Sequence, residues 1–120
     1  MALQKLTGTD AFVVIDLPDA PHADGVVRWA KKVLQDGART MARSRTYSWA
    51  LLERQISGAS AGISATPEHR DEAIAAFVGE LRDSVATGSL SLDAGKGVSA
   101  EDLSGWMQLD RRSPSRTEAE

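Results

Sequence analysis

The chain has 120 residues, a length that suits one domain with one hydrophobic core. Hydrophobic residues make up 42% and charged residues 26%, which favours neither a disordered nor a fibrous protein. A net charge of -3 argues against a nucleic-acid partner, and the absence of cysteine excludes disulfides, thiolate metal sites and cysteine nucleophiles. The longest apolar run, residues 11–15, falls far short of the ~20 residues that span a bilayer. The N-terminus has no apolar core of a secretory signal. We therefore expect a cytoplasmic protein without a membrane partner.

The first half of the chain predicts a strand followed by a long helix. Residues 11–17 (AFVVIDL) are β-branched and aromatic and stop at Pro18, as is typical of a buried strand. Prolines 18 and 21 prevent a helix from starting before about Asp24. Apolar residues then recur at spacings of three and four, which predicts an amphipathic helix that continues through residues 44–55. Its apolar stripe consists of Val26, Ala30, Val33, Leu34, Gly37, Ala38 and Met41. The glycine-rich residues 57–65 (SGASAGISA) are expected to interrupt it as a loop with a tight turn, in which only residues 63–65 are strand-like.

A second long helix is predicted to begin with Thr66 as its N-cap and Pro67 in its first position. Gly88 is placed to close it in a left-handed conformation. The predicted buried stripe of this helix is Ile74, Phe77, Val78, Leu81 and Val85. Residues 89–92 (SLSL) then form a short candidate strand.

The last predicted helix is short and starts at a weak capping box formed by Ser99 and Asp102. Its apolar side consists of Leu103, Trp106 and Met107. Together the elements predict an α/β fold: a small layered domain over residues 1–109, with a short mixed sheet, two long helices and one short helix. Residues 110–120 are polar and expected to be a disordered tail.

Residues 58–62 (GASAG) fit the G-x-S-x-G pattern that presents a nucleophilic serine in many hydrolases. That pattern needs a strand, then the serine on a sharp turn, then a helix, and an acid and a histidine further along. Here the segment before Ser60 is helical in character, and the one downstream histidine, His69, follows after only nine residues. The pattern therefore favours a glycine-rich turn over a hydrolase site.

Two other sequence patterns are only weak evidence for a phosphate-binding or a metal-binding site. Residues 88–97 (GSLSLDAGKG) end like a phosphate-binding loop, but six residues separate Gly88 from Gly95 where four are required. Lys96 between two glycines could still approach an anionic ligand, although a flexible surface loop is the simpler interpretation. His22 and His69 are far apart in sequence and have no carboxylates at a metal-binding spacing, so no metal site is expected.

Taken together, several segments resemble a known family. Residues 43–63 (RSRTYSWALLERQISGASAGI) resemble, without a gap, the stretch of the Glu/Leu/Phe/Val dehydrogenases that runs from a methionine-threonine-tyrosine-lysine motif to a glycine-rich loop with the catalytic lysine. The matching residues are Thr46, Tyr47, Ala50, Leu51, Gly58 and Ile63. Residues 71–81 are similar to the helix after this loop, and residues 88–103 to the segment that carries the catalytic aspartate. The resemblance covers about residues 11–108 and implies the N-terminal domain that holds the substrate and forms oligomers.

The chemical positions of the family differ in this chain. In the family one lysine holds the substrate carboxylate, a second activates water and an aspartate shuttles protons; these positions fall on Ser48, Ser60 and Gly95. A hydroxyl cannot supply a fixed positive charge and glycine exchanges no proton, so we expect a degenerate and inactive domain, with Lys96 as a partial substitute. NAD(P) is implied by the resemblance alone; no G-x-G-x-x-G turn is present, so no cofactor is expected in this chain.

Two hypotheses follow from the sequence. The first is an oxidoreductase-like domain that keeps a pocket for an amino acid or 2-oxo acid, with Gly58, Ser60 and Lys96 as the substrate-binding residues, and that forms a homo-oligomer. The second is a non-catalytic module that self-associates or binds a partner through strand 11–17 and the stripe of the first long helix. A preformed polar pocket would favour the first, and a large exposed apolar patch the second.

Overall fold

The central element of the fold is one mixed sheet. The computed structural model describes residues 1–106, and in them five strands follow the order β1-β2-β4-β3-β5. The strands are β1 (Ala2–Lys5), β2 (Ala11–Ile15), β3 (Ala23–Ala30), β4 (Ser57–Ser64) and β5 (Leu90–Ala94). β3 pairs in parallel with both β4 and β5, whereas β2 runs antiparallel to β1 and β4. This arrangement confirms the predicted α/β class and mixed sheet.

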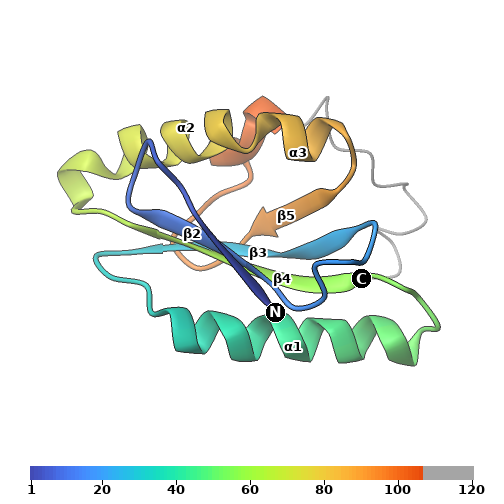
Figure 1. The fold of residues 1–120 in the computed structure, drawn as a ribbon. Helices are drawn as coiled ribbons and strands as arrows, with labels where there is room; N and C mark the ends of the chain where they lie inside the picture. The colour runs from blue at the N-terminus through green and yellow to red at the C-terminus, as the bar shows by residue number, and fades with distance from the viewer. Residues whose placement is uncertain (107–120) are drawn as a thin grey trace.

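Helices cover both faces of the sheet (Figure 1). The helix α1 (Gln35–Leu51) lies on one face, where it packs mainly over β2 and β4. The opposite face carries α2 (Arg70–Glu80), α3 (Arg82–Ala86) and the 3-10 helix η2 (Glu101–Trp106), with η1 (Pro67–His69) leading into α2. The main hydrophobic core lies on the α2 side, around Phe77, Ile63 and Val13. On the α1 side a much smaller apolar cluster consists of Phe12, Val14, Ala38 and Ala42.

The predicted start of the first helix, near Asp24, is wrong. Residues 23–30 form the strand β3, and the helix begins only at Gln35. Of the predicted stripe on this helix, Ala38 is buried but Met41 is exposed, and Ala42 and Trp49 supply the remaining buried contacts. The helical spacing in residues 26–34 is coincidental, because β3 is buried between two parallel neighbours and takes its conformation from pairing with β4 and β5.

The predicted loop at residues 57–65 is also wrong, because residues 57–64 form β4, a strand with neighbours on both sides. Small side chains on β4 let α1 lie very close to the sheet. A Cβ atom added to Gly58 would lie 1.7 Å from the Ala42 carbonyl oxygen, and one added to Gly62 would lie 2.4 Å from Val33 Cγ1. The glycines therefore serve close helix–strand packing and not a turn.

The second half of the chain follows the predictions more closely. One long helix was predicted from residue 67; the structure has η1, α2 and α3, which follow one another with a single interruption at Leu81, where φ is -95° and ψ is 6°. Gly88 has a φ of 82°, as predicted for a left-handed cap, and β5 overlaps the predicted strand. The strand β1 was not predicted. Met107 and the predicted tail at residues 110–120 lie outside the described residues.

Candidate functional site

Two pockets lie along the seam between α1 and β3. The first, which we call the Ser48 pocket, has a volume of about 260 Å³ and is lined from α1 by Met41, Ser44, Arg45 and Ser48. Its sheet side consists of Gly25, Val26 and Ala59. The second, which we call the Lys96 pocket, has a volume of about 360 Å³ and lies near the start of α1.

Ser48 is an exposed residue on the wall of the Ser48 pocket. Its hydroxyl donates to the Ser44 carbonyl one turn earlier, over 3.2 Å. The neighbouring Thr46 fixes the helix to the sheet, because its hydroxyl accepts a 2.7 Å hydrogen bond from the Gly58 N–H and donates to the Ala42 carbonyl. Ser48 is thus accessible to a small molecule, but it offers only a hydroxyl.

Ser60 lies in the middle of β4 and is 1% exposed. Its Cα pairs with those of Val14 and Val26 on the two neighbouring strands, and its hydroxyl has no hydrogen-bond partner among the described residues. Ser60 therefore stands in mid-strand and not on a strand–turn–helix elbow, and no base activates it. A nucleophilic role, which the sequence disfavoured, has no support in this geometry.

Gly95 begins the turn after β5, and its N–H donates to the Val27 carbonyl over 2.9 Å. A Cβ atom at this position would lie 2.3 Å from Val26 Cγ1 and 2.9 Å from the Val27 carbonyl oxygen. Real Cβ atoms essentially never approach a neighbour below 3.0 Å. An aspartate here would therefore require β3 to shift, so the glycine is a packing requirement of this chain.

Lys96 is exposed and lines the Lys96 pocket, while its carbonyl accepts a 2.9 Å hydrogen bond from the Trp29 N–H. Gly58 and Ser60 are buried beneath α1 and line neither pocket of the seam. The structure therefore does not bring the three predicted substrate-binding residues, Gly58, Ser60 and Lys96, into one of these pockets. Their role in binding stays a prediction.

A buried charge network beside the Ser48 pocket was missed by the sequence analysis. Asp24 is fully buried, and its Oδ2 accepts hydrogen bonds from Arg45 Nε over 2.8 Å and from Trp49 Nε1 over 3.0 Å. Arg45 Nη2 also lies 3.7 Å from Asp93 Oδ2. The spacing of Arg45 and Trp49, four residues apart on α1, was the available signal, but Asp24 had been placed at the start of the predicted first helix.

A second cluster lies on the face of the sheet opposite α1, where it joins the start of α2 to η2. Arg70 Nη2 donates to Asp102 Oδ2 over 2.6 Å and to the Gly97 carbonyl over 2.8 Å, and its guanidinium lies 5.5 Å from the centre of the Trp29 ring. The predicted capping box is confirmed, since Ser99 and Asp102 exchange hydrogen bonds of 2.8 and 3.2 Å. The Ser99 N–H, and then Arg70, hold the pKa of Asp102 below its ordinary value.

The described residues contain no glycine-rich turn between a strand and a long helix of the kind that holds the pyrophosphate of a nicotinamide dinucleotide. The turns after β3 and β4, residues 31–34 and 65–66, contain no glycine. Residues 95–100 (GKGVSA) have the spacing G-x-G-x-x-A, but they lead into the six-residue 3-10 helix η2 and not into a long α-helix. Gly97, with a φ of 82°, is packed against the Trp29 backbone, where a Cβ would lie 2.7 Å from the carbonyl oxygen, so it opens no space for a pyrophosphate.

Residues 1–106 contain no group of three or more His, Asp or Glu side chains arranged to hold a metal ion. None of the helices in these residues is both long and apolar enough to span a bilayer.

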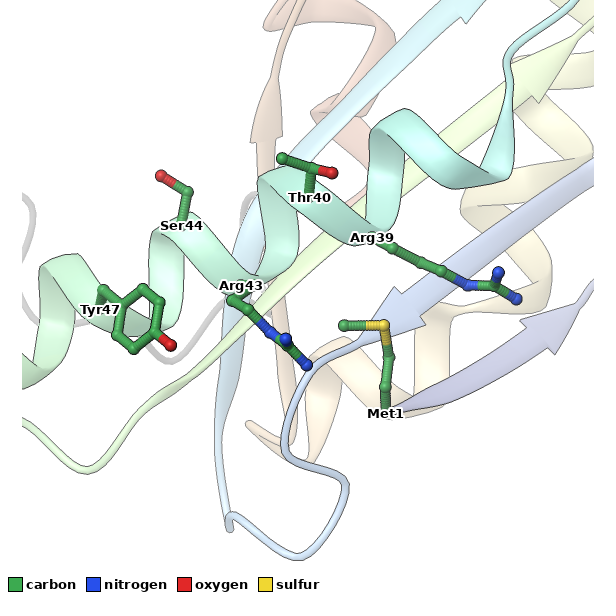
Figure 2. A pocket seen from close by; sticks show the side chains of 6 residues that line it. All are labelled: Met1, Arg39, Thr40, Arg43, Ser44 and Tyr47. Carbon is green, nitrogen blue, oxygen red and sulfur yellow. The ribbon is translucent and has the colours of Figure 1, made fainter.

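The outer side of α1 carries a further hollow of about 490 Å³, lined by Arg39, Thr40, Arg43, Ser44, Tyr47 and Met1. Figure 2 shows that all of these side chains except Met1 come from α1, and that Met1 approaches from just before the start of β1. Arg43 Nε lies 3.6 Å from Asp16 Oδ1, and Tyr47 is 64% exposed. This surface is open and mixed in character, which suits a contact with another protein better than a small ligand.

Comparison with known proteins is informative at the level of structure. No protein-family profile matches the sequence, and no curated protein matches it either. L-Tryptophan dehydrogenase from Nostoc punctiforme has a similar fold, with a TM-score of 0.71 and 17% identity over 89% of this chain and 34% of its own. A hetero-hexameric glutamate dehydrogenase from Thermus thermophilus has a TM-score of 0.67 and 20% identity over 82% of this chain and 25% of its own. Glutamate dehydrogenase from Peptoniphilus asaccharolyticus has a TM-score of 0.67 and 14% identity over 82% and 26%.

These matches confirm the resemblance at the level of fold. The chain spans between a quarter and about a third of the length of the solved chains that it matches. The three positions at which this chain differs from the family, Ser48, Ser60 and Gly95, all lie within the mixed sheet and the helices and turns that cover or connect it. The described part of the chain therefore has the fold of the N-terminal domain of the amino-acid dehydrogenases.

Proposed function

We propose that the chain is a ligand-binding and oligomer-forming domain of the amino-acid-dehydrogenase type, which binds an amino acid or 2-oxo acid in the cytoplasm and does not itself catalyse oxidative deamination. The proposal rests on the three residues that stand where the family has its two lysines and its aspartate. Ser48 is exposed with only a hydroxyl, Ser60 is buried in mid-strand, and Gly95 has no room for a side chain.

Oxidative deamination needs groups that these positions do not supply. The resemblance implies a lysine that holds the substrate carboxylate, a lysine that activates water and an aspartate that moves protons. A serine hydroxyl carries no fixed charge and remains protonated at neutral pH, so it cannot replace either lysine. The buried Ser60 would also be out of reach of a substrate in the Ser48 pocket.

The Ser48 pocket nevertheless keeps features of a binding site. Hydroxyls from Ser44 and Ser48 and the guanidinium of Arg45 line a hollow of about 260 Å³, which is large enough for a small amino or oxo acid. Arg45 is held by Asp24 and Asp93, so its position is fixed before a ligand arrives. A preformed polar pocket favours the ligand-binding hypothesis over a purely structural role.

A thermal-shift panel of amino acids, 2-oxo acids and NAD(H) tests the proposal. A ligand at ten times its Kd should stabilise the fold by about 1.4 kcal/mol, which raises Tm by roughly 4 °C for a domain of this size. The variant Ser48→Glu places a negative charge in the pocket and should abolish the shift given by a carboxylate ligand. Thr40→Glu, on α1 but outside the pocket, is the matched control and should leave the shift unchanged.

Two results would contradict the proposal. If no amino or oxo acid changes Tm at millimolar concentration, the chain has no such ligand. If the purified chain reduces NAD+ in the presence of an amino acid, and Ser48→Glu removes that activity, the domain is catalytic.

A second candidate function is self-association without a ligand. The sequence suggested a contact through strand 11–17 and the stripe of the first long helix; β2 is paired on both sides by β1 and β4, so it has no free edge for a partner strand. The end of α1 offers another surface, where Tyr47, Leu51 and Leu52 are 64%, 86% and 54% exposed. Light scattering distinguishes the two: an oligomer of the wild type that dissociates in Leu51→Glu but not in Ala75→Glu, an exposed position of α2 on the opposite face of the sheet, supports association through this surface.

A further inference from the structure

The Lys96 pocket lies where three elements end or begin together. β3 and β5 run in parallel, so their carboxyl ends meet at one edge of the sheet, and α1 starts at the same edge (Figure 1). The pocket is lined there by Arg28 and Trp29 of β3, by Leu34 and Gly37 at the start of α1, and by Lys96 in the turn after β5. In open α/β sheets this edge is a common place for ligands.

The pocket is strongly positive. Arg28, Lys32 and Lys96 all line it, and no acidic residue does. Within residues 1–106 none of the three side chains forms an ion pair or a side-chain hydrogen bond. Arg45 and Arg70, by contrast, are each held by carboxylates. Three like charges around one pocket of about 360 Å³ repel each other, and a bound anion would offset that repulsion.

Arg28 adds a buried donor that lacks an acceptor. Its Nε is buried and has no hydrogen-bond partner in the described part of the chain. The side chain lies on the face of β3 that also carries Asp24, the residue that contacts α1, and its Cγ lies 3.2 Å from the position a Cβ of Gly95 would occupy. A buried charged donor without an acceptor is costly, so this atom indicates that the site is completed by an anion.

The start of α1 contributes further donors. The 17-residue helix has Leu34 at its N-cap, where no side chain accepts a hydrogen bond from the first-turn N–H groups. Gly37, in that turn, has no atom within 4 Å of a built Cβ, so the helix end is open toward the pocket that it lines. The N-terminal N–H groups and the helix dipole together favour an anion at this place.

We propose that the Lys96 pocket binds the phosphate group of a small molecule. Three cations and a helix N-terminus match a group with two negative charges and several acceptor oxygens, whereas a monocarboxylate would leave most of the positive charge without a partner. The site differs from the Ser48 pocket in its residues, so the inference does not depend on the proposed function.

Calorimetric titration of the purified chain with inorganic phosphate and with ribose 5-phosphate tests the inference, at an ionic strength kept constant with sodium chloride. Lys96→Gln and Lys32→Gln remove one charge each from the pocket and should weaken binding by about tenfold each, as expected for the loss of one charge-assisted contact. Lys31→Gln is the matched control, because Lys31 is an exposed neighbour that does not line the pocket; it should bind phosphate like the wild type.

The outcomes separate the sources of the anion and decide the proposal. Tighter binding of ribose 5-phosphate than of inorganic phosphate assigns the site to an organic phosphate, and the reverse order assigns it to free phosphate. The proposal is overturned if neither compound binds at millimolar concentration. It is equally overturned if Lys31→Gln weakens binding as much as Lys96→Gln does, since the attraction would then be a property of the whole surface. Ser48→Glu should bind phosphate normally, so a failure of the amino-acid ligand and a failure of the phosphate site are distinguishable.

Discussion

Replacing Gly58 by alanine should force α1 away from the sheet. The new Cβ would lie 1.7 Å from the Ala42 carbonyl oxygen and 2.7 Å from the Thr46 nitrogen, and both are backbone atoms that cannot rotate away. The closer contact must open from 1.7 Å to at least 3.0 Å. This movement would also stretch the 2.7 Å hydrogen bond from the Gly58 N–H to the Thr46 hydroxyl.

The expected cost combines two effects. Forcing one extra carbon into a packed contact costs about 1–3 kcal/mol, and a weakened hydrogen bond adds about 1 kcal/mol. We take the upper part of this range, about 3–4 kcal/mol, because the atoms that the new Cβ meets belong to the backbone of α1 and cannot rotate away. For a domain of this size Tm should then fall by roughly 12 °C or more.

Thermal and urea unfolding followed by circular dichroism measure this change. Gly37→Ala is the matched control on the same helix: a Cβ at Gly37 meets no atom within 4 Å, so alanine should stabilise the helix by about 0.5–1 kcal/mol. The two substitutions should therefore change Tm in opposite directions. If Gly58→Ala unfolds at the same temperature as the wild type, α1 does not pack on β4 as closely as the structure shows, and the explanation for the small residues of β4 fails.

Three further predictions concern the polar side chains of Ser60, Asp24 and Asp102. Ser60→Ala removes a buried hydroxyl without a partner and should leave stability unchanged or raise it by up to about 1 kcal/mol in urea unfolding, whereas a large loss would show that the hydroxyl is bonded. Asp24→Asn breaks the buried pair with Arg45 and should cost about 3 kcal/mol, while Asp36→Asn, at a carboxylate that is 97% exposed, should cost less than about 0.5 kcal/mol; equal losses would refute a special role for Asp24. The pKa of Asp102 is lower in the folded protein than its ordinary 3.8, so its contribution to stability is full above that value and is lost as the pH falls through the lower folded value. Tm measured from pH 6 down to pH 2 should thus fall less steeply below about pH 4 in Asp102→Asn than in the wild type, and identical acid limbs would contradict this.

The parts of the fold that were predicted correctly carry local signals. Pro67 and the acidic residues after it mark a helix start, and Gly88 closes the helical region with a positive φ that L-amino acids avoid. The capping box of Ser99 and Asp102 needs only four consecutive residues to form. In each case the information lies within one or two turns of the chain, so the sequence pattern is sufficient.

The geometry of the candidate site, in contrast, could not be predicted from local sequence patterns. Ser48, Ser60 and Gly95 were identified through the resemblance, but their exposure could not be inferred, because it depends on how α1 packs on β4. Ser60 is buried because Gly58 and Gly62 beside it let the helix approach. Lys96 was singled out from its glycine neighbours, whereas Arg28 and Lys32, which line the same pocket, were not. Arg28 and Lys32 lie in β3 and the turn after it, whereas Lys96 lies in the turn after β5, and only the parallel pairing of β3 and β5 brings Lys96 to the other two.

The sequence by itself determined the strand at residues 11–15, the helices from residue 67 to residue 86 and the α/β class, because each follows from hydrophobic periodicity and capping residues that act locally. Only the tertiary structure decided that residues 23–30 and 57–64 are the central strands. Their conformation depends on partners more than 30 residues away in the chain, and their composition, with glycines, serines and a buried aspartate, is atypical of strands. Gly58 and Gly62 of β4 must be small because α1 and the residues that lead into it pack closely on them. That close packing exists only once the sheet has formed.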